Sequence, residues 1–287
     1  DWKREQDAVK KEAAKGELGR FAAGLPKISD GQQLFVLNGL SKLAVDGKMA
    51  IIQDASSLYV GDAGSGPSNI RQYILENDWL DAIVRLSTNQ FMNTGIGTYI
   101  WIIKKNKSVE RSGKVQLIDA RHCFESRRRP IGKKRNDITD RCCELITQAY
   151  GEYKDNQRYG DDEIYCESKI YDTKEFGYSK IIIEHPMLDE NGEILRDSKS
   201  RPIPNADMRD SENVPLTEDI DEYFEREIKS YAPNAWIDRK KTKVGYEIPM
   251  TRYFYEFPKF SSRDDIEGIL VEMENNIQKS MKILFEG

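Results

Sequence analysis

The chain lacks any long hydrophobic run. None of its apolar stretches approaches the roughly 18 residues that a membrane-spanning helix needs. No charged segment followed by an apolar stretch opens the sequence, so no secretory signal is indicated. Hydrophobic residues make up 38% of the 287 residues and the mean hydropathy is −0.69, which indicates a packed core beneath a strongly charged surface. These absences predict a cytoplasmic protein without a membrane partner.

Cysteine and histidine are also scarce. The four cysteines are Cys123, Cys142, Cys143 and Cys166, and their spacing matches neither a CxxC metal ribbon nor a disulfide framework. This pattern favours incidental thiols in a reducing compartment and predicts no metal site. A zinc ligand pair at His122 and Cys123 is the alternative interpretation.

Hydrophobic periodicity predicts alternating helices and strands in the first half of the chain. We expect helices over 32–45, 70–78 and 138–150, a buried strand over 48–53, two strands within 79–104, and another over 113–120. Such alternation is typical of an α/β sheet with parallel crossovers. The two strands within 79–104 are joined by about ten residues, too few for a crossover helix, so they should run antiparallel.

The remaining segments are less regular. Residues 1–30 are polar and should form loops, 169–188 a hairpin, 188–195 an Asn-Gly turn, 196–215 an irregular segment and 245–257 an extended one. A helix capped by Thr217 should follow the irregular segment. The tail carries a heptad-like apolar stripe at Ile266, Leu270, Met273, Ile277 and Leu284. This terminal helix packs either on its own domain or against a partner helix.

Charge is unevenly distributed along the chain. The net charge is −5, yet the segment RRRPIGKKR over 127–135 contains no acidic residue. Such a basic strip suits contact with a nucleic-acid backbone, and a solvated loop is the alternative. The candidate phosphate contacts are Arg127, Arg128, Arg129, Lys133, Lys134 and Arg135.

Several segments in a fixed order carry a resemblance to a known family. The strongest is GDAGSGPSNIRQYILENDWLDAIVRLSTNQFMNTGIGTYIWIIKK over 61–105, followed by KVQLIDA, FGYSKI and APNAWIDRKKTKVGYEI. Together they closely resemble the modification (methyltransferase) subunit of type I restriction–modification systems. The family methylates adenine N6 in DNA, which implies that the parent protein flips the target adenine out of the duplex.

The resemblance implies a fold and a division of the chain. The expected fold is the C-terminal half of a Rossmann-like S-adenosylmethionine-dependent methyltransferase sheet that ends in an antiparallel strand pair. A mixed α+β extension and a C-terminal helix should follow. The expected segments are a loop over 1–30, the methyltransferase half over 31–120, the basic segment, helix and hairpin over 121–215, and a partner-docking region over 216–287.

The family's catalytic motifs are missing from this sequence. No Asn-Pro-Pro or Asp-Pro-Pro occurs, and the glycine clusters at 61–66 and 95–97 do not stand between a strand and a helix as a cofactor turn does. The resemblance therefore implies that S-adenosylmethionine binds elsewhere in the parent protein and that this chain alone binds no cofactor and is inactive. A non-catalytic DNA- or subunit-binding protein from a split or truncated gene is the alternative.

The resemblance also implies one site residue and several partners. In related enzymes an aromatic in the loop between the last strands stacks on the flipped base, and Phe91 occupies that place here. A lid over the sheet edge is the alternative role for Phe91. The implied partners are DNA, the specificity and restriction subunits of a type I system, and a second modification subunit.

Overall fold

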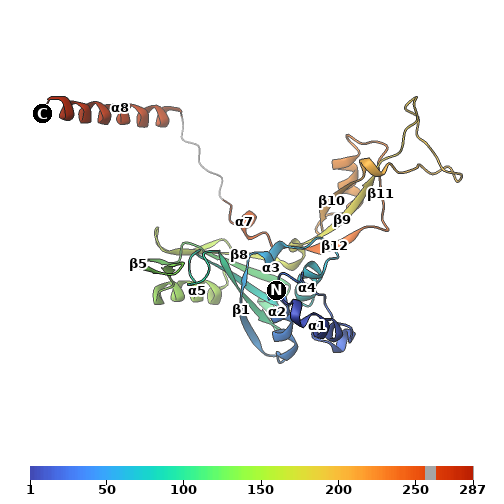
Figure 1. The fold of residues 1–287 in the computed structure, drawn as a ribbon, viewed down its shortest axis with the longest axis horizontal. Coiled ribbons are helices and arrows are strands. Elements are labelled where there is room, and N and C mark those ends of the chain that lie inside the picture. The colour runs from blue at the N-terminus through green and yellow to red at the C-terminus, as the bar shows by residue number, and fades with distance from the viewer. Residues whose placement is uncertain (256–262, 287) are drawn as a thin grey trace. The chain divides into compact units, whose positions relative to one another are not determined.

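The computed structural model describes residues 1–255 and 263–286, which form two compact units, residues 1–250 and 251–287 (Figure 1). The first unit is built around a six-stranded mixed sheet with the order β1-β3-β2-β4-β8-β7. Its strands are β1 (Lys48–Asp54), β2 (Leu80–Leu86), β3 (Thr98–Lys104), β4 (Lys114–Ala120), β7 (Gln157–Gly160) and β8 (Tyr165–Asp172).

The strand directions confirm the predicted α/β class and its antiparallel pair. β2 and β3 are antiparallel neighbours joined by a loop, as the short connection predicts. β3 also pairs antiparallel with β1, so it lies between β1 and β2. The sheet continues beyond β2 through β4, which runs parallel to β2, and then through β8 and β7.

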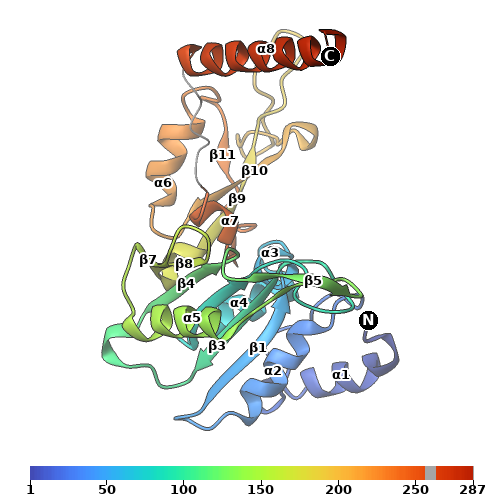
Figure 2. The ribbon, with the colours of Figure 1, turned by 90° about the vertical axis from the view of Figure 1, so that its left-hand side faces the viewer.

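Helices surround this sheet. α5 covers one face over β4 and β8 (Figure 2), where Val84, Ile118 and Ala149 belong to one buried cluster. Alternate strand residues such as Ile83, Trp101 and Leu117 are buried as well, so both faces of the sheet are covered. The helices of this unit include α1 (Gln6–Ala13), α2 (Gln32–Lys42), α3 (Ser56–Tyr59), α4 (Gly66–Glu76) and α5 (Asp140–Glu152).

The strand β1 lies at one edge of this sheet. The prediction of a buried strand at 48–53 was right about the strand and wrong about its burial, because Ile52 is 50% exposed. Its apolar composition is explained by α2 and α3, which pack against parts of it (Figure 2). An apolar edge strand with free backbone groups favours pairing with another chain segment.

A second, antiparallel sheet follows along the chain. Its central strand β9 (Gly177–Glu184) pairs with β10 (Asp210–Pro215) on one side, and with β11 (Trp236–Ile237) and β12 (Lys243–Tyr246) on the other. Over it lies α6 (Ile220–Tyr223), continued by the π-helix η6 (Phe224–Ile228), whose Phe224 and Ile228 are buried. The cap of this helix is Asp219, which accepts hydrogen bonds from two backbone N–H groups, and not Thr217.

Three sequence-based expectations were wrong about local structure. Residues 1–30 contain the helix α1, because its Gln, Ala and Lys residues favour helix and Val9 packs inward. Residues 169–188 are no hairpin, since β8 and β9 belong to different sheets. A capping box between Asp172 and Glu175 redirects the chain between them. Within the polar stretch 196–215, pairing with β9 forms the strand β10.

Two further helix boundaries differ from the predicted ones. α4 begins at Gly66 with Pro67 in its first turn, before the predicted start at residue 70, and it ends at Glu76. Helix α7 (Met250–Tyr253) occupies part of the segment expected to be extended, whose residues 256–257 lie outside the described residues.

The second unit contains the terminal helix α8 (Arg263–Glu286), as the heptad-like stripe predicts. The stripe residues Ile266, Leu270, Met273 and Ile277 are between 49% and 60% exposed, and the side chain of Leu284 lies outside the description. No helix in residues 1–255 or 263–286 has the length and apolarity to cross a membrane.

Candidate nucleic-acid interface

The carboxyl ends of the parallel strands meet at one edge of the six-stranded sheet. β1, β2 and β4 run in the same direction, and the register places Asp54 opposite Thr98 and Leu86 opposite Ala120. In open α/β sheets, ligands bind outside the carboxyl ends of the strands. The loops that leave this edge are therefore the expected position of a ligand-binding site.

The loop that carries Phe91 leaves this edge between β2 and β3. Phe91 is partly exposed, while the neighbouring Gln90 is buried and donates a hydrogen bond to the Ser87 hydroxyl. The backbone N–H of Asn89 donates to the carbonyl of Gly95 at 3.3 Å, which closes the loop on itself. The loop is thus a compact turn that leaves one aromatic side chain accessible.

The basic segment forms a two-stranded hairpin, β5 (Glu125–Ile131) and β6 (Lys134–Asp137). Arg127 and Lys134 both contact the carboxylate of Asp137, at 2.6 and 3.0 Å, and these two hydrogen-bonded cations hold the pKa of Asp137 below its ordinary value. The other four cations are exposed and form no ion pair within the described part of the chain: Arg128, Arg129, Lys133 and Arg135.

The structure brings the basic hairpin and the Phe91 loop together. The backbone N–H of Lys133 donates to the carbonyl of Met92 at 2.8 Å, and that of Arg135 donates to the carbonyl of Asn89 at 2.9 Å. Sequence reasoning singled out both segments but gave no reason for their contact. A partly exposed aromatic beside unpaired cations is a combination that suits nucleic acid, where bases stack and phosphates attract positive charge.

Charged groups that sequence reasoning missed lie at the end of β4. Asp119 is 3% exposed and contacts Arg121 at 3.0 Å and Arg85 of β2 at 3.5 Å. The signal that would have found them is the parallel register, which sets Arg85 directly opposite Asp119. Here the two arginines are held by a buried carboxylate, so they fix the edge of the sheet.

Asp54, at the end of β1, is also held in a local network. It accepts hydrogen bonds from the Gln32 amide at 2.7 Å and from the Ser56 backbone N–H at 2.8 Å. Burial raises the pKa of Asp54, but the hydrogen bonds from Ser56 and Gln32 outweigh it, so the pKa lies below its ordinary value. This carboxylate is an occupied structural acceptor and does not replace the missing Asn-Pro-Pro motif.

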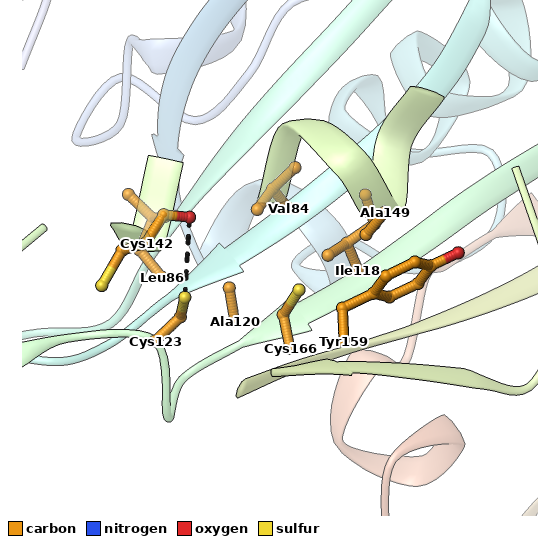
Figure 3. Close-up of a cluster of buried hydrophobic side chains, with 9 residues drawn as sticks. All are labelled: Val84, Leu86, Ile118, Ala120, Cys123, Cys142, Ala149, Tyr159 and Cys166. Carbon is orange, nitrogen blue, oxygen red and sulfur yellow. Dashed lines mark hydrogen bonds between the residues drawn. The ribbon is translucent and has the colours of Figure 1, made fainter. Parts of the chain in front are cut away.

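Three of the four cysteines are core residues. Cys123, Cys142 and Cys166 belong to one buried cluster between the sheet and α5, which carries Cys142 (Figure 3), and Cys143 is exposed. Burial raises the pKa of the Cys123 thiol, which keeps it protonated and a poor metal ligand. Within the described residues no group of three or more His, Cys, Asp or Glu side chains is placed to hold a metal ion.

The glycine-rich stretch 61–66 does not form a cofactor cradle. A Cβ added at Gly66 would lie 1.8 Å from the carbonyl oxygen of Leu25, so protein backbone already fills the space beside this glycine. On the other side of this contact, a Cβ added at Gly24, which has φ +146°, would lie 2.9 Å from the carbonyl oxygen of Gly66. These glycines serve packing between the two segments, so the stretch 61–66 has no room for S-adenosylmethionine.

The fold defines an α/β domain with an exposed basic hairpin beside a loop at the carboxyl edge of its sheet. Comparison with known proteins identifies its family. A model of the family described as "N-6 DNA Methylase" matches residues 2–180. The chain belongs to this family, whose members use S-adenosylmethionine.

Similar proteins confirm the predicted resemblance to type I modification subunits. The "Type I restriction enzyme MjaVIII methylase subunit" of Methanocaldococcus jannaschii is 34% identical over 108 residues, covering 38% of this chain and 18% of the relative. The MjaIX methylase subunit of the same organism is 24% identical over 173 residues, or 60% and 28% of the two chains. The matched regions therefore span only 18% and 28% of the length of these two relatives.

A solved structure of the type I restriction–modification methyltransferase subunit from Streptococcus thermophilus is 29% identical. The match covers 55% of this chain and 30% of that one, with a TM-score of 0.45.

Proposed function

We propose that this chain is the part of a DNA adenine-N6 methyltransferase that holds the target strand and its flipped adenine. Phe91 stacks on the unpaired base, and the β5–β6 hairpin contacts the DNA backbone. The observation that carries this proposal is the direct bonding of the Phe91 loop to the basic hairpin at the carboxyl edge of the sheet. The methyl-donor site lies outside this chain, which we propose is inactive alone.

The role of Phe91 predicts a loss specific to unpaired adenine. A duplex with a central bubble of unpaired adenines presents the base without the cost of flipping. Phe91→Ala should weaken binding of this bubble about tenfold, because stacking of one base on an aromatic ring contributes about 1–3 kcal/mol. Fluorescence anisotropy with labelled oligonucleotides measures the change.

The matched control for Phe91→Ala is Met92→Ala. It removes the side chain of the next residue, which is 62% exposed but is not aromatic and so cannot stack in the same way. The control should bind the bubble like the wild type, and both variants should bind a fully paired duplex equally. Equal binding of the bubble by Phe91→Ala and wild type would mean that Phe91 is only a lid over the sheet edge.

The hairpin cations predict a change in salt dependence. Neutralising the four unpaired cations by glutamine should reduce the slope of log K against log salt by roughly 0.9 for each lost phosphate contact. Neutralising only Arg127 and Lys134, which share Asp137, should reduce it less per residue. Titrations at several salt concentrations measure the slope, and an unchanged slope in the fourfold variant would favour the solvated-loop interpretation.

The terminal helix α8 suits a docking role. Its exposed stripe of Ile266, Leu270, Met273 and Ile277 has the heptad-like spacing of a helix that packs on another helix. We propose the specificity subunit as its partner and a second modification subunit as the alternative.

In analytical ultracentrifugation, Leu270→Asp should abolish co-sedimentation of this chain with a purified specificity subunit, because it places a charge in the apolar contact. The control Asn275→Asp adds the same charge away from the stripe and should retain binding. Equal binding by both variants would rule the stripe out as the contact.

The alternative function is non-catalytic binding of DNA or of partner subunits. DNA binding without catalysis is favoured if the chain binds the bubble and the fully paired duplex equally, if the hairpin cations account for this binding, and if Phe91→Ala does not change it. The restriction subunit would then be a partner through the assembled complex only.

A further inference from the structure

The segment that carries Phe91 is fastened to the hairpin by four hydrogen bonds. Besides the bonds from Lys133 and Arg135, the backbone N–H of Asn136 donates to the carbonyl of Asn89 at 3.2 Å, and its side-chain amide donates to the carbonyl of Thr88 at 2.8 Å. The acceptors lie on both sides of Phe91 in the sequence. The backbone that positions this aromatic ring is therefore held by the hairpin and not by the sheet alone.

Asn136 pairs with Ser126 in the hairpin, and its side chain faces the Phe91 loop. It is 9% exposed, and its side-chain amide is directed at the loop although it stands in a hairpin of otherwise accessible residues. A buried amide costs free energy unless it is hydrogen-bonded, so the contact with Thr88 fixes the relative position of the two segments. Asn136 contacts the Phe91 loop by both its backbone and its side chain.

Gly132 shows how close this approach is. It adopts φ +59° at the turn of the hairpin, and an added Cβ would lie 2.5 Å from the carbonyl oxygen of Met92. Any other residue there pushes the hairpin turn and the loop apart. Glycine is required here by the neighbouring loop as well as by the turn.

The same residues join the two kinds of DNA contact. Lys133 and Arg135 hold the loop through their backbone N–H groups, while their exposed side chains are free of ion pairs within the described residues. A phosphate bound by either side chain is thus held by a residue whose own backbone N–H donates to the Phe91 segment.

We propose that the β5–β6 hairpin is a positioning element, in which Asn136 and Gly132 hold Phe91 in place for the unpaired base while the adjacent cations hold the backbone. This inference rests on the proposed stacking role of Phe91. Asn136 and Gly132 are positioning residues and touch neither base nor phosphate in this scheme.

The test uses Asn136→Ala and Gly132→Ala in the full chain. Neither variant changes a charge. The control is Gly16→Ala, which has nearly the same backbone strain, with φ +61° at Gly16, but nothing within 4 Å of the added Cβ. Hydrogen exchange of the amides of 133–136 in the free protein reports whether the loop contact has opened, and it should accelerate in both variants and not in the control.

Binding of the adenine-bubble duplex then reports the consequence. Both variants should lose about tenfold in affinity, as Phe91→Ala does, with the salt slope of the wild type retained. In a double-mutant cycle, Asn136→Ala should have no further effect once Phe91 is alanine, because the two act as one unit. A purely structural role would instead lower affinity equally in both backgrounds.

Two results would overturn the positioning role. The first is that Asn136→Ala and Gly132→Ala exchange their amides at 133–136 faster but bind the bubble with wild-type affinity, while Phe91→Ala still weakens this binding. The second is an additive double-mutant cycle. If Phe91→Ala binds the bubble like the wild type, the proposed function of Phe91 fails, and the positioning role fails with it. This outcome is distinguished from the other two because it needs no hairpin variant.

Discussion

Replacing Asp81 by alanine is expected to lower the free energy of unfolding by about 3–5 kcal/mol, because it leaves buried cations without a counter-charge. Asp81 is fully buried at a β-bulge in β2. One of its oxygens contacts Lys104 at 3.2 Å and Arg111 at 3.3 Å and accepts a hydrogen bond from Tyr150 at 2.5 Å. This carboxylate thus links β2, β3 and α5 at the end of the sheet opposite the Phe91 loop.

Burial of Lys104 and Arg111 makes the effect large. Their side chains are 17% and 6% exposed, so water cannot replace the lost carboxylate. Asp81→Asn keeps the size of the side chain and the polar contact with Tyr150 but removes the charge. Its free energy of unfolding should therefore lie between those of the wild type and Asp81→Ala. Urea denaturation followed by circular dichroism gives the three values.

The control for Asp81 is Glu218→Ala, which removes a carboxylate paired with Arg226 at the surface. The stability of this variant should be close to that of the wild type, since Arg226 regains water. If Asp81→Ala were no more destabilised than Glu218→Ala, the buried network would contribute nothing beyond its packing.

Replacing Arg71 by leucine is expected to cost about 3 kcal/mol or more, because several buried carbonyl groups lose their hydrogen-bond donor at once. Arg71 has no exposed surface, and burial lowers its pKa to about 10. Its guanidinium donates to the carbonyls of Tyr246 at 2.5 Å, Val60 at 2.9 Å, Ser57 at 3.2 Å and Gly61 at 3.4 Å.

These contacts join parts of the chain that are distant in sequence. Tyr246 belongs to β12 of the second sheet, and its backbone N–H also donates to the Ser68 hydroxyl of α4 at 3.0 Å. Arg71→Leu should therefore open β12 before the rest of the unit, which hydrogen exchange of 243–248 measures. Arg71→Lys should have an intermediate stability, since one ammonium group cannot replace the five N–H donors of the planar guanidinium.

The control for Arg71 is Arg196→Leu, in which an exposed arginine that donates to one carbonyl is replaced. It should leave both the stability and the exchange of β12 unchanged. Protection of 243–248 in Arg71→Leu at the wild-type level would contradict the role of Arg71 in holding β12 against α4.

The sequence alone predicted the elements with strong periodicity. The strands around Ile83, Trp101 and Leu117 and the helix α5 were located because residues that face a core must recur at the period of their element. The basic strip and the family resemblance were likewise visible, since both depend on local residue order. Errors arose where local order is ambiguous, as in β10 and around the connection between β8 and β9.

Local sequence order does not determine which segments meet in space. That β3 lies between β1 and β2, that Asp81 collects partners from three elements, and that Arg71 reaches β12 depend on pairing over long sequence separations.

The contact between the Phe91 loop and the β5–β6 hairpin is of the same kind. Three of its four hydrogen bonds have backbone N–H donors, which nearly every residue carries, so only the tertiary structure identifies the residues that make it.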